Sequence, residues 1–543
     1  MESMNEFRTE LGLNIFKNKY AQNQYETWAD RAHIVVDAVA GTNGGTEQAL
    51  MTKEERDQLV EYLVDFKWLP GGRYLWYAGR KARFYNNCYL LKAEEDSREE
   101  WADLWQRAGS CLMTGGGIGI DVTNFRPKGR TLSKTGGVSS GPIPFLLATN
   151  EIGRNVMQGG SRRSAMYGSM NWQHEDAQDF LRVKNWTPEQ RAAKEADFNA
   201  PAPLDMMNVS LNYDDAWLKD KSNPVFLENV KQAMKTGEPG FSFNFGDKQN
   251  ETLRNACCEV VSEDDSDVCN LSSVNMSRIE SVEEFKDVVH LVTKFLVCGL
   301  ERAELPYQKV YDVRQKNSRL GLGLMGMHEW LLKRGHKYEV TDELKQWLKV
   351  YRNESDHTSR DFCNELYRVI PKGVRAIAPT GTISILAGTT SGVEPVYSVA
   401  FKRRYLTDGT RWKHEFVVDG TAQVLIEMGI NPNKIESAVD LAQDPERRIK
   451  FQHDVQAYVD QAISSTINLP AWDTEHNNAD LIPQYVGWIQ KYAKGLRGLT
   501  VYPDGARGGQ PITSVPYEEA INKKGMIFED NSEEQCLSGV CGI

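Results

Sequence analysis

Five consecutive residues carry the densest set of reactive groups in the sequence: Asn255-Ala256-Cys257-Cys258-Glu259. Side chains alternate between two faces on a β-strand, so residues 255, 257 and 259 would share one face and Cys258 would point away. That face would present an amide, a thiol and a carboxylate in a row. Burying an amide beside a carboxylate is costly without a purpose. The pattern therefore predicts a strand with a functional face, rather than a strand that carries polar residues by chance.

Four further cysteines fall into two groups that could take part in thiol chemistry. Cys88 leads a short apolar strand, and Cys269 begins a stretch that reads Cys-Asn-Leu-Ser-Ser. These two thiols could equally be core residues, and the sequence does not bring them together. Cys536 and Cys541 stand in a polar C-terminal segment that holds no further ligands for zinc. A dithiol that exchanges with a buried disulfide is the favoured interpretation of this second pair.

The segment Ala376–Ser384 has the composition of an anion-binding loop. An apolar strand runs into a turn of small hydroxyl residues and then into a predicted helix. Backbone N–H groups at a helix start, with hydroxyls around them, bind anions, although an ordinary capped helix has the same pattern. The residues concerned are Thr380, Gly381, Thr382 and Ser384.

A glycine-rich turn at Gln158–Ser164 is followed by paired arginines. This composition suits a loop that contacts phosphates or a base, and a solvated surface loop is the alternative.

Two other motifs match known sites poorly. Gly321–Gly326 fits G-x-G-x-x-G, but Arg314–Arg319 before it is too polar for the strand of a dinucleotide-binding unit. Glu354–His357 has one Glu-x-x-His where a di-metal helix bundle needs two, so a solvated helix face is expected.

The elements that must position these residues are helices followed by a long α/β alternation. Amphipathic helical patterns cover residues 25–39 and 53–66, and Leu69-Pro70-Gly71-Gly72 ends them. From there to about residue 515, apolar segments alternate with helical ones and predict an α/β fold that is compatible with a barrel. The clearest apolar segments are 117–120, 207–211, 374–378 and 498–502.

Composition excludes several classes of protein. The chain has 543 residues, of which 40% are hydrophobic and 26% charged, so it can bury a sizeable core. A net charge of −11 argues against binding to a nucleic-acid polymer or an anionic membrane. No apolar run approaches ~18 residues and the first residues lack a signal-peptide core, so a cytoplasmic protein is expected. An odd number of cysteines, nine, argues against a disulfide-stapled fold.

Taken together, these motifs resemble the catalytic subunit of ribonucleotide reductase, in that family's order along the chain. They are Asn-x-Cys-x-Glu, Cys-Asn-Leu-Ser-Ser, Pro-Thr-Gly-Thr-Ile-Ser-Ile, Ser391–Pro395 and the C-terminal dithiol. The resemblance implies a ten-stranded α/β barrel with a central finger loop, preceded by a short helical N-terminal region. It divides the chain into a helical region at 1–68, the barrel at 69–520 and a flexible redox-active tail at 521–543.

The resemblance also implies a role for each residue of the first motif. Cys257 would carry a thiyl radical that abstracts the ribose 3′ hydrogen on the way to a 2′-deoxyribonucleotide, a DNA precursor. Glu259 would take the proton of the 3′ hydroxyl, and Asn255 would hold the sugar by hydrogen bonding. The other implied substrate contacts are Asn87, Ser139, Ser140, Thr380, Gly381, Thr382 and Ser384.

Four cysteines would handle the electrons. Cys88 and Cys269 would supply two electrons as the 2′ hydroxyl leaves as water, and Cys536 and Cys541 would reduce the resulting disulfide.

The glycine-rich turn matches the family's specificity loop, which links an effector nucleotide to the choice of substrate. The implied effector contacts are Asp96, Arg126, Gly159, Gly160, Arg162 and Arg163.

The radical source and the partners are also implied by the resemblance. Leu499–Gly505 is similar to the adenosylcobalamin-dependent branch, which we favour, whereas the tail looks more like the branch served by a separate ferritin-like metal subunit. No metal is expected on this chain itself. Expected partners are a ribonucleoside di- or triphosphate, a dNTP or ATP effector, a thioredoxin- or glutaredoxin-type reductant and a second copy of the chain. Because only residues 1–68 precede Leu69, we expect no on/off control by ATP and dATP.

Two other functions are weighed against this one. A glycyl-radical lyase relays a thiyl through adjacent cysteines such as Cys257 and Cys258, but it needs an Arg-Val-x-Gly-Tyr type of loop near the C-terminus, and the sequence has none. An inactive nucleotide-binding homologue would have no need of the dithiol at Cys536 and Cys541.

Overall fold

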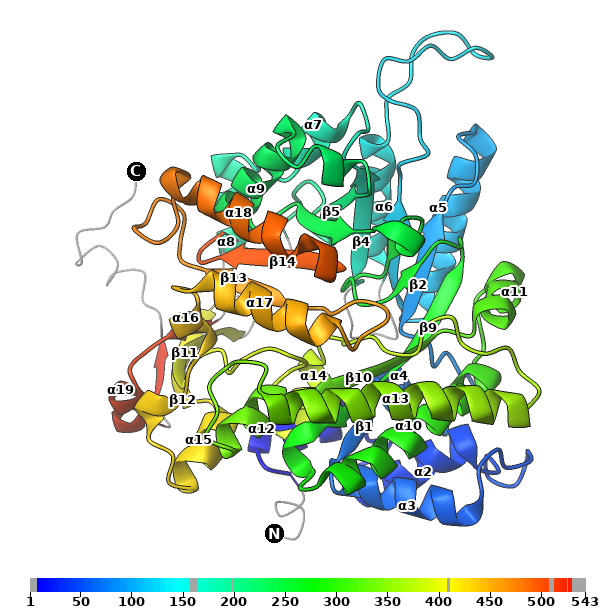
Figure 1. The fold of residues 1–543 in the computed structure, drawn as a ribbon, viewed down its shortest axis with the longest axis vertical. Helices are drawn as coiled ribbons and strands as arrows, with labels where there is room; N and C mark the ends of the chain where they lie inside the picture. The colour runs from blue at the N-terminus through cyan, green and yellow to red at the C-terminus, as the bar shows by residue number, and fades with distance from the viewer. Residues whose placement is uncertain are drawn as a thin grey trace.

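The chain is described here by a computed structural model that covers residues 7–156, 164–197, 200–407, 411–506, 512–524 and 526–529 (Figure 1). It begins with a helical layer: α1 (Glu10–Ile15), the π-helical turn η2 (Phe16–Tyr20), α2 (Trp28–Ala40) and α3 (Lys53–Val64). Capping boxes start both long helices, Thr27 with Asp30 and Thr52 with Glu55. The two helices predicted for this region are therefore confirmed.

A large mixed sheet forms the centre of the molecule. Its strands lie in the order β1-β9-β2-β3-β4-β5-β6-β14-β13, and β10 also pairs with β9. Neighbours from β2 to β6 are parallel, whereas β9 is antiparallel to β2 and β14 is antiparallel to β6. The strands are β1 (Trp68–Pro70), β2 (Cys88–Lys92), β3 (Gly117–Asp121), β4 (Met166–Asn171), β5 (Met207–Tyr213), β6 (Gly240–Phe243), β9 (Asp267–Asn275), β10 (Leu320–Met325), β13 (Thr466–Leu469) and β14 (Gly498–Pro503).

Two short segments close this sheet into a barrel. Leu322 of β10 forms a parallel bridge with Arg375, and Ile377 forms another with Ile463, which leads into β13. The ring therefore runs from β9 through β2–β6, β14, β13 and residues 374–377 to β10 and back to β9. This confirms the predicted ten-stranded α/β barrel, although residues 374–378 form isolated bridges where a full strand was expected.

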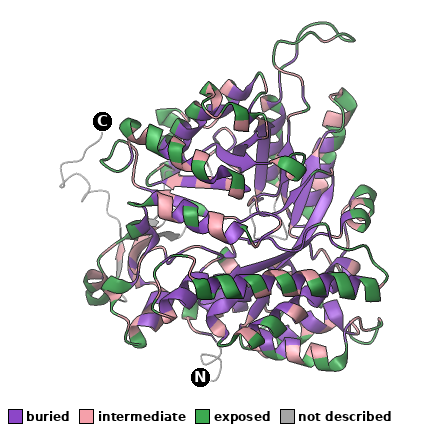
Figure 2. Ribbon diagram, viewed as in Figure 1, coloured by how far each residue is buried: buried purple, intermediate pink, exposed green. Residues whose placement is uncertain are grey.

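Helices surround the barrel, and the buried strands lie inside them (Figure 2). The α-helices are α4 (Gly72–Tyr77), α5 (Arg98–Met113), α6 (Ile143–Asn155), α7 (Ala177–Leu181), α8 (Pro188–Ala196), α9 (Pro224–Thr236), α10 (Val282–Arg302), α11 (Gln308–Asn317), α12 (Met327–Lys333), α13 (Asp342–Glu365), α14 (Gly381–Ala387), α15 (Gly420–Glu427), α16 (Ala438–Leu441), α17 (Pro445–Gln456), α18 (Ile482–Tyr492) and α19 (Tyr517–Asn522). Short 3-10 turns are η3 (Trp217–Lys219), η4 (Gly246–Lys248), η5 (Met276–Arg278), η6 (Pro432–Lys434), η7 (Ala479–Leu481) and η8 (Ala493–Gly495). No helix in the described ranges has the length and apolar character to span a membrane.

A second, smaller sheet lies at one side of the barrel (Figure 1). Its order is β15 (Ile512–Ser514), β11 (Ala400–Thr407), β12 (Arg411–Val418) and β16 (Ile527–Glu529), all antiparallel. β16 belongs to the segment that was expected to be a flexible tail, and the expected boundary at residue 520 falls inside α19. The described part of this segment is thus tied to the sheet up to Glu529.

A two-stranded hairpin, β7 (Leu253–Arg254) and β8 (Val261–Ser262), forms the finger. The finger runs so close to β3 that a Cβ on Gly119 would lie 1.7 Å from the carbonyl oxygen of Arg254. A Cβ on Gly117 would likewise lie 3.0 Å from the Cβ of Ala256. Gly117 and Gly119 leave this part of the inner face of β3 without side chains, and this makes room for the finger.

Candidate active site

The tip of the finger is a turn and not the strand that its polar alternation predicted. The ladder ends at Arg254 and Val261, and the N–H of Cys258 donates to the carbonyl of Asn255 at 3.0 Å. Cys258 has φ +70°, in the left-handed region that a strand never uses. The turn nevertheless sends Asn255, Cys257 and Glu259 to one cavity, of about 340 Å³, which Cys258 does not line.

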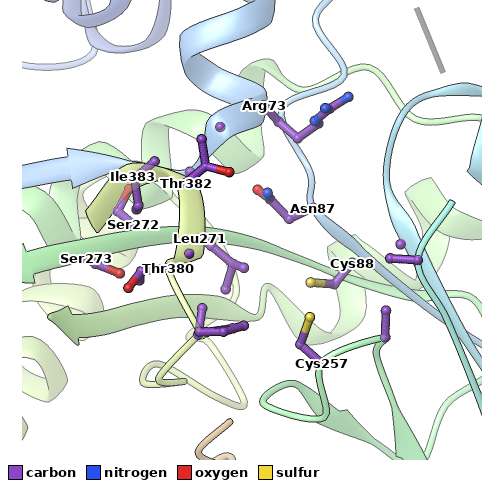
Figure 3. A pocket seen from close by; sticks show the side chains of 18 of the residues that line it. Arg73, Asn87, Cys88, Cys257, Leu271, Ser272, Ser273, Thr380, Thr382 and Ile383 are labelled. Atoms are coloured by element: carbon purple, nitrogen blue, oxygen red, sulfur yellow. The ribbon is translucent and has the colours of Figure 1, made fainter. Parts of the chain in front are cut away.

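Several elements converge on this cavity, which we call the substrate cavity (Figure 3). The finger lies on one side, and η2, α4, β2, β9 and α14 supply most of the remaining wall. Figure 3 shows the sulfur atoms of Cys88 and Cys257 pointing toward each other. Besides the finger residues, the polar and charged lining residues are Lys19, Tyr20, Arg73, Trp76, Tyr77, Asn87, Cys88, Ser272, Ser273, Thr380 and Thr382.

The register between β2 and β9 brings Cys88 and Cys269 together. They are direct partners on antiparallel strands, and both are buried, free thiols. Residues so placed have Cα atoms about 4.5–5.5 Å apart, which is the spacing that a disulfide needs. No local sequence pattern indicates this pairing, because the two cysteines lie in distant parts of the chain, and only the family resemblance implies it.

Asn255 connects the finger to this thiol pair. Its side-chain nitrogen donates to Cys88 Sγ at 3.0 Å, and its oxygen accepts from the N–H of Val260 at 2.9 Å. The second bond fixes the orientation of the amide, since the oxygen is held by the finger's own backbone. Asn87, the residue before Cys88, also lines the cavity, and its N–H donates to the carbonyl of Cys269 at 3.2 Å.

Glu259 is a buried carboxyl with one weak contact. Its Oε1 lies 4.0 Å from Cys88 Sγ, and its Oε2 has no hydrogen-bond partner among the described residues. Burial raises the pKa of Glu259 to about 7, although the nearby Asn255 amide acts in the opposite direction. A carboxyl with such a pKa can exchange a proton near neutral pH, as a general acid or base must.

The paired thiols keep their protons at neutral pH. Burial raises the pKa of Cys88 well above its ordinary value, and the Glu259 carboxylate adds to this. Burial also raises the pKa of Cys269 well above the usual value, with Asp267 as a further cause. Protonated thiols can donate hydrogen as well as electrons, so the pair suits a reductant that acts inside the cavity.

The N-terminal end of α14 and its cap residue Thr380 carry most of the predicted phosphate contacts. Thr380, Gly381 and Thr382 line the cavity. Thr380 has φ +54°, and its hydroxyl accepts from the N–H of Gly392 at 2.9 Å. Ser384 does not line the cavity, because its hydroxyl is hydrogen-bonded to that of Ser391 at 2.7 Å.

Two predicted substrate contacts lie elsewhere. Ser139 and Ser140 belong to the loop between β3 and α6, and neither lines the substrate cavity. Ser139 is buried there and accepts from the N–H of Gly141 at 3.1 Å, whereas Ser140 is exposed. The structure therefore gives Ser139 a role in shaping its own loop.

The structure brings together Asp96 and Arg126 of the predicted effector set. The N–H of Arg126 donates to the Asp96 carboxylate at 3.0 Å, and its guanidinium donates to the Asp96 carbonyl at 3.0 Å. An ion pair between the two side chains completes the contact. The remaining effector residues Gly159, Gly160, Arg162 and Arg163 lie outside the described residues, as do Cys536 and Cys541.

Sequence reasoning missed one wall of the cavity. Lys19 and Tyr20 come from η2, and Gly71, Gly72 and Arg73 from the β1–α4 junction. The Pro-Gly-Gly break at this junction was a signal, but it indicated only the end of a helix. Nothing in the local pattern of η2 indicated that it reaches a cavity.

A second cavity, of about 300 Å³, lies against Cys257, Ala256 and Cys258 of the finger tip and against β14. Cys257 therefore borders both cavities. The hydroxyl-bearing residues that line the second cavity include Ser464, Ser465, Thr466 and Thr500. Across the ranges that the structure describes, no group of three or more His, Cys, Asp or Glu residues could hold a metal ion.

Comparison with known proteins agrees with this architecture. The family described as "Ribonucleotide reductase, barrel domain" matches residues 86–234, 219–352 and 341–502. A "Vitamin B12-dependent ribonucleoside-diphosphate reductase" of Mycobacterium tuberculosis is 26% identical, over 84% of this chain and 73% of that protein. A "Putative adenosylcobalamin-dependent ribonucleoside-triphosphate reductase" of Mycobacterium phage D29 is 22% identical, over 95% of this chain and 96% of that protein.

A solved structure shares the fold. It is described as a B-12 dependent (class II) ribonucleotide reductase, and it superposes with a TM-score of 0.71 at 16% identity. The match covers 94% of this chain and 94% of that chain.

Proposed function

Because the chain belongs to the ribonucleotide reductase family, we propose that it is a catalytic subunit that reduces ribonucleotides to 2′-deoxyribonucleotides. One observation carries the proposal: Cys257, Asn255, Glu259 and Cys88 line a single cavity, and Cys269 is the direct strand partner of Cys88. A thiyl, a base and a dithiol are the groups that this reduction requires.

The first half of the reaction takes place at the finger tip. The Cys257 thiyl takes the hydrogen atom from C3′ of the ribose and becomes a thiol. The Glu259 carboxylate accepts the proton of the 3′ hydroxyl, and the 2′ hydroxyl leaves as water with a proton from the thiol pair. The pKa of Glu259, raised to about 7, allows it to take and return this proton near neutral pH.

The second half consumes the thiol pair. Cys88 and Cys269 together give up two electrons and two protons and end as a disulfide. Cys257 returns its hydrogen atom to C3′ and is again a thiyl. The balance is one ribonucleotide and two thiols converted to one deoxyribonucleotide, one disulfide and one water.

The radical source that we propose is adenosylcobalamin, on the side of the second cavity. That cavity borders Cys257, and its hydroxyl-bearing lining matches the polar groups of a nucleoside. When bound, adenosylcobalamin supplies the radical that converts the Cys257 thiol to a thiyl. The vitamin B12- and adenosylcobalamin-dependent relatives favour this source over a separate metal-containing subunit.

The proposal includes the reductant and the effector. Cys536 and Cys541 reduce the disulfide by thiol–disulfide exchange and are themselves reduced by a thioredoxin- or glutaredoxin-type protein. Asp96 and Arg126, with Gly159, Gly160, Arg162 and Arg163, bind a dNTP or ATP effector in a homodimer of the chain.

A direct assay tests this function. The purified chain is mixed with adenosylcobalamin, dithiothreitol, an effector and either a ribonucleoside di- or triphosphate, and deoxynucleotide is measured. We expect product with the wild-type chain and none with Cys257→Ala. If product forms only when a metal-containing subunit is added, that subunit and not adenosylcobalamin is the radical source. If no product forms with either radical source, the chain is an inactive homologue.

A further inference from the structure

The segment Phe7–Tyr20 forms a wall of the substrate cavity. Its last two residues, Lys19 and Tyr20, line the cavity beside Gly72 and Arg73. Tyr20 is 2% exposed, and a Cβ on Gly72 would lie 3.0 Å from its hydroxyl oxygen. The close approach of the ring to Gly72 fixes the backbone that carries Lys19 at the cavity.

The same segment is anchored on α12 and on α14, and the first residues of α14 line the cavity. Arg8 forms an ion pair of 2.6 Å with Glu329, which is fully buried, and donates to the carbonyl of Gly388 at 3.1 Å. A Cβ on Gly12 would lie 3.0 Å from the carbonyl oxygen of Leu386. These contacts hold the N-terminal segment and α14 in a fixed relation.

Charge is distributed unevenly around the cavity. Its cationic lining residues are Lys19 and Arg73, and its one lining carboxyl is Glu259, which lies beside Cys88. In Figure 3, Arg73 and Thr382 lie away from Cys88 and Cys257, with Asn87 between the two groups. Arg73 is only 7% exposed, and a charge that water reaches poorly acts strongly on a ligand.

This asymmetry fits a ligand whose neutral part faces the thiols and whose anionic part faces Lys19 and Arg73. A guanidinium matches a phosphoryl group with paired hydrogen bonds, and an ammonium adds a point charge. We infer that Lys19 and Arg73 bind the outermost phosphoryl group of the substrate and set the preference for nucleoside polyphosphates over monophosphates. The inference rests on the proposed function, since it assumes that a ribonucleotide occupies this cavity.

Equilibrium binding tests the inference without turnover. Cytidine and its mono-, di- and triphosphate are titrated into the purified chain in the presence of a saturating deoxynucleotide effector. Lys19→Met and Arg73→Met should each weaken di- and triphosphate binding about tenfold, which is typical of a lost charged hydrogen bond, and leave cytidine binding unchanged. In turnover, KM should rise while kcat is largely kept.

Matched variants separate charge from structure. Lys17 lies on the same turn, but it donates to the carbonyl of Glu26 at 2.8 Å and does not line the cavity, so Lys17→Met should bind every ligand as the wild type does. Lys19→Arg keeps the charge and should keep most of the affinity. Thermal melting shows whether each variant is folded.

Salt gives a measurement that needs no substitution. Triphosphate binding to the wild-type chain should weaken as ionic strength rises, whereas cytidine binding should not. Unchanged polyphosphate affinity in folded Lys19→Met and Arg73→Met, or an equal loss for cytidine, would overturn this inference alone. A wild-type chain that binds no ribonucleotide would overturn the proposed function as well.

Discussion

The amide of Asn255 joins two kinds of chemistry at the finger tip. Its oxygen is held by the N–H of Val260, and its nitrogen donates to Cys88 Sγ. Glu259 Oε1 lies 4.0 Å from the same sulfur, in a site that water reaches poorly. In the proposed mechanism, the proton-transfer group Glu259 and the oxidised thiol therefore meet at Cys88 Sγ, so a substitution that alters proton transfer should also alter thiol oxidation.

The raised pKa of Glu259 predicts the pH dependence of the chemical step. In the proposed mechanism Glu259 acts first as a base, so the ionised form is the active one. Below pH 7 the carboxyl is protonated, and the rate of single-turnover reduction should rise with pH through about 7. The thiols Cys88 and Cys269 stay protonated over this range, so they should add no opposing slope.

Rapid-quench measurement of deoxynucleotide between about pH 6 and 8 checks this slope. Glu259→Gln keeps the size of the side chain and cannot accept the proton, so it should be inactive at every pH. A rate that is flat across this range in the wild-type chain would contradict the base role.

Cys257 and Cys258 should respond differently to substitution. Cys257 lines both cavities, whereas Cys258 lines only the second one and has a left-handed backbone. Cys257→Ala should abolish reduction, because no other sulfur can replace it. Cys258→Ala should keep substantial activity and change the free energy of unfolding by at most ~1–2 kcal/mol.

Steady-state deoxynucleotide formation and a thermal melt distinguish the two cysteines. Cys258→Gly provides a further control, because glycine adopts the left-handed conformation without strain. If both Cys257→Ala and Cys258→Ala are folded and inactive, a two-cysteine relay of the glycyl-radical type gains support.

At the level of elements, the finger depends on a strand with a bare inner face. Gly117 and Gly119 of β3 face the finger, and Gly321 and Gly323 of β10 leave similar room near Cys269 and Ser273. In β10 the glycines belong to the G-x-G-x-x-G motif, which is here a barrel strand. The same residue pattern thus serves close packing between barrel strands.

Gly119→Ala should displace the finger. The added methyl group would overlap the carbonyl of Arg254, so the finger backbone must move. Overpacking of this kind costs ~1–3 kcal/mol of stability, and a shift of ~1 Å at a reactive group can cost ~100-fold in rate.

Gly109 is the matched control for this substitution. It lies in α5 with no atom within 4 Å of a built Cβ, so Gly109→Ala should keep activity and raise the free energy of unfolding by about 0.5–1 kcal/mol. Activity assays with melting curves compare the two variants. Full activity of Gly119→Ala would contradict the close contact between finger and barrel.

Sequence patterns predicted the regular elements better than the site. Apolar segments predicted β3, β5 and β14, and two amphipathic patterns predicted α2 and α3. These predictions succeed because the signals depend on local periodicity. The sequence of the finger tip predicts a strand, because polar residues at alternate positions of a turn have the same pattern as one face of a strand. The pairing of Cys88 with Cys269 depends on the register of distant strands, which no local pattern contains.

At the scale of the whole molecule, the barrel encloses the thiol pair away from solvent. Cys88 is 3% exposed and Cys269 is 0% exposed, and both lie between the finger and the barrel wall. A large reductant protein cannot reach sulfur atoms at this depth. A small arm that carries its own thiols is the form of reductant that the enclosure favours.

A variant without the tail thiols should therefore complete a single turnover but not multiple turnovers. Cys536→Ser with Cys541→Ser should still form about one product per active site, because Cys88 and Cys269 hold the electrons for one cycle. Further turnover with thioredoxin should stop. Steady turnover of the double variant with thioredoxin would show that the disulfide is reduced by another route.

The pairing of β16 with β12 has a consequence for this exchange. β16 ends at Glu529, and Cys536 and Cys541 follow by seven and twelve residues. A chain of seven or twelve residues spans at most about 25 or 42 Å, so in the proposed exchange the end of β16 sets how far each tail thiol can reach. A short tether gives its end group an effective concentration on the order of millimolar near the anchor. If the tail thiols act as proposed, reduction of the Cys88–Cys269 disulfide is an intramolecular step, whose rate should depend on the number of residues between β16 and the thiols and not on the enzyme concentration.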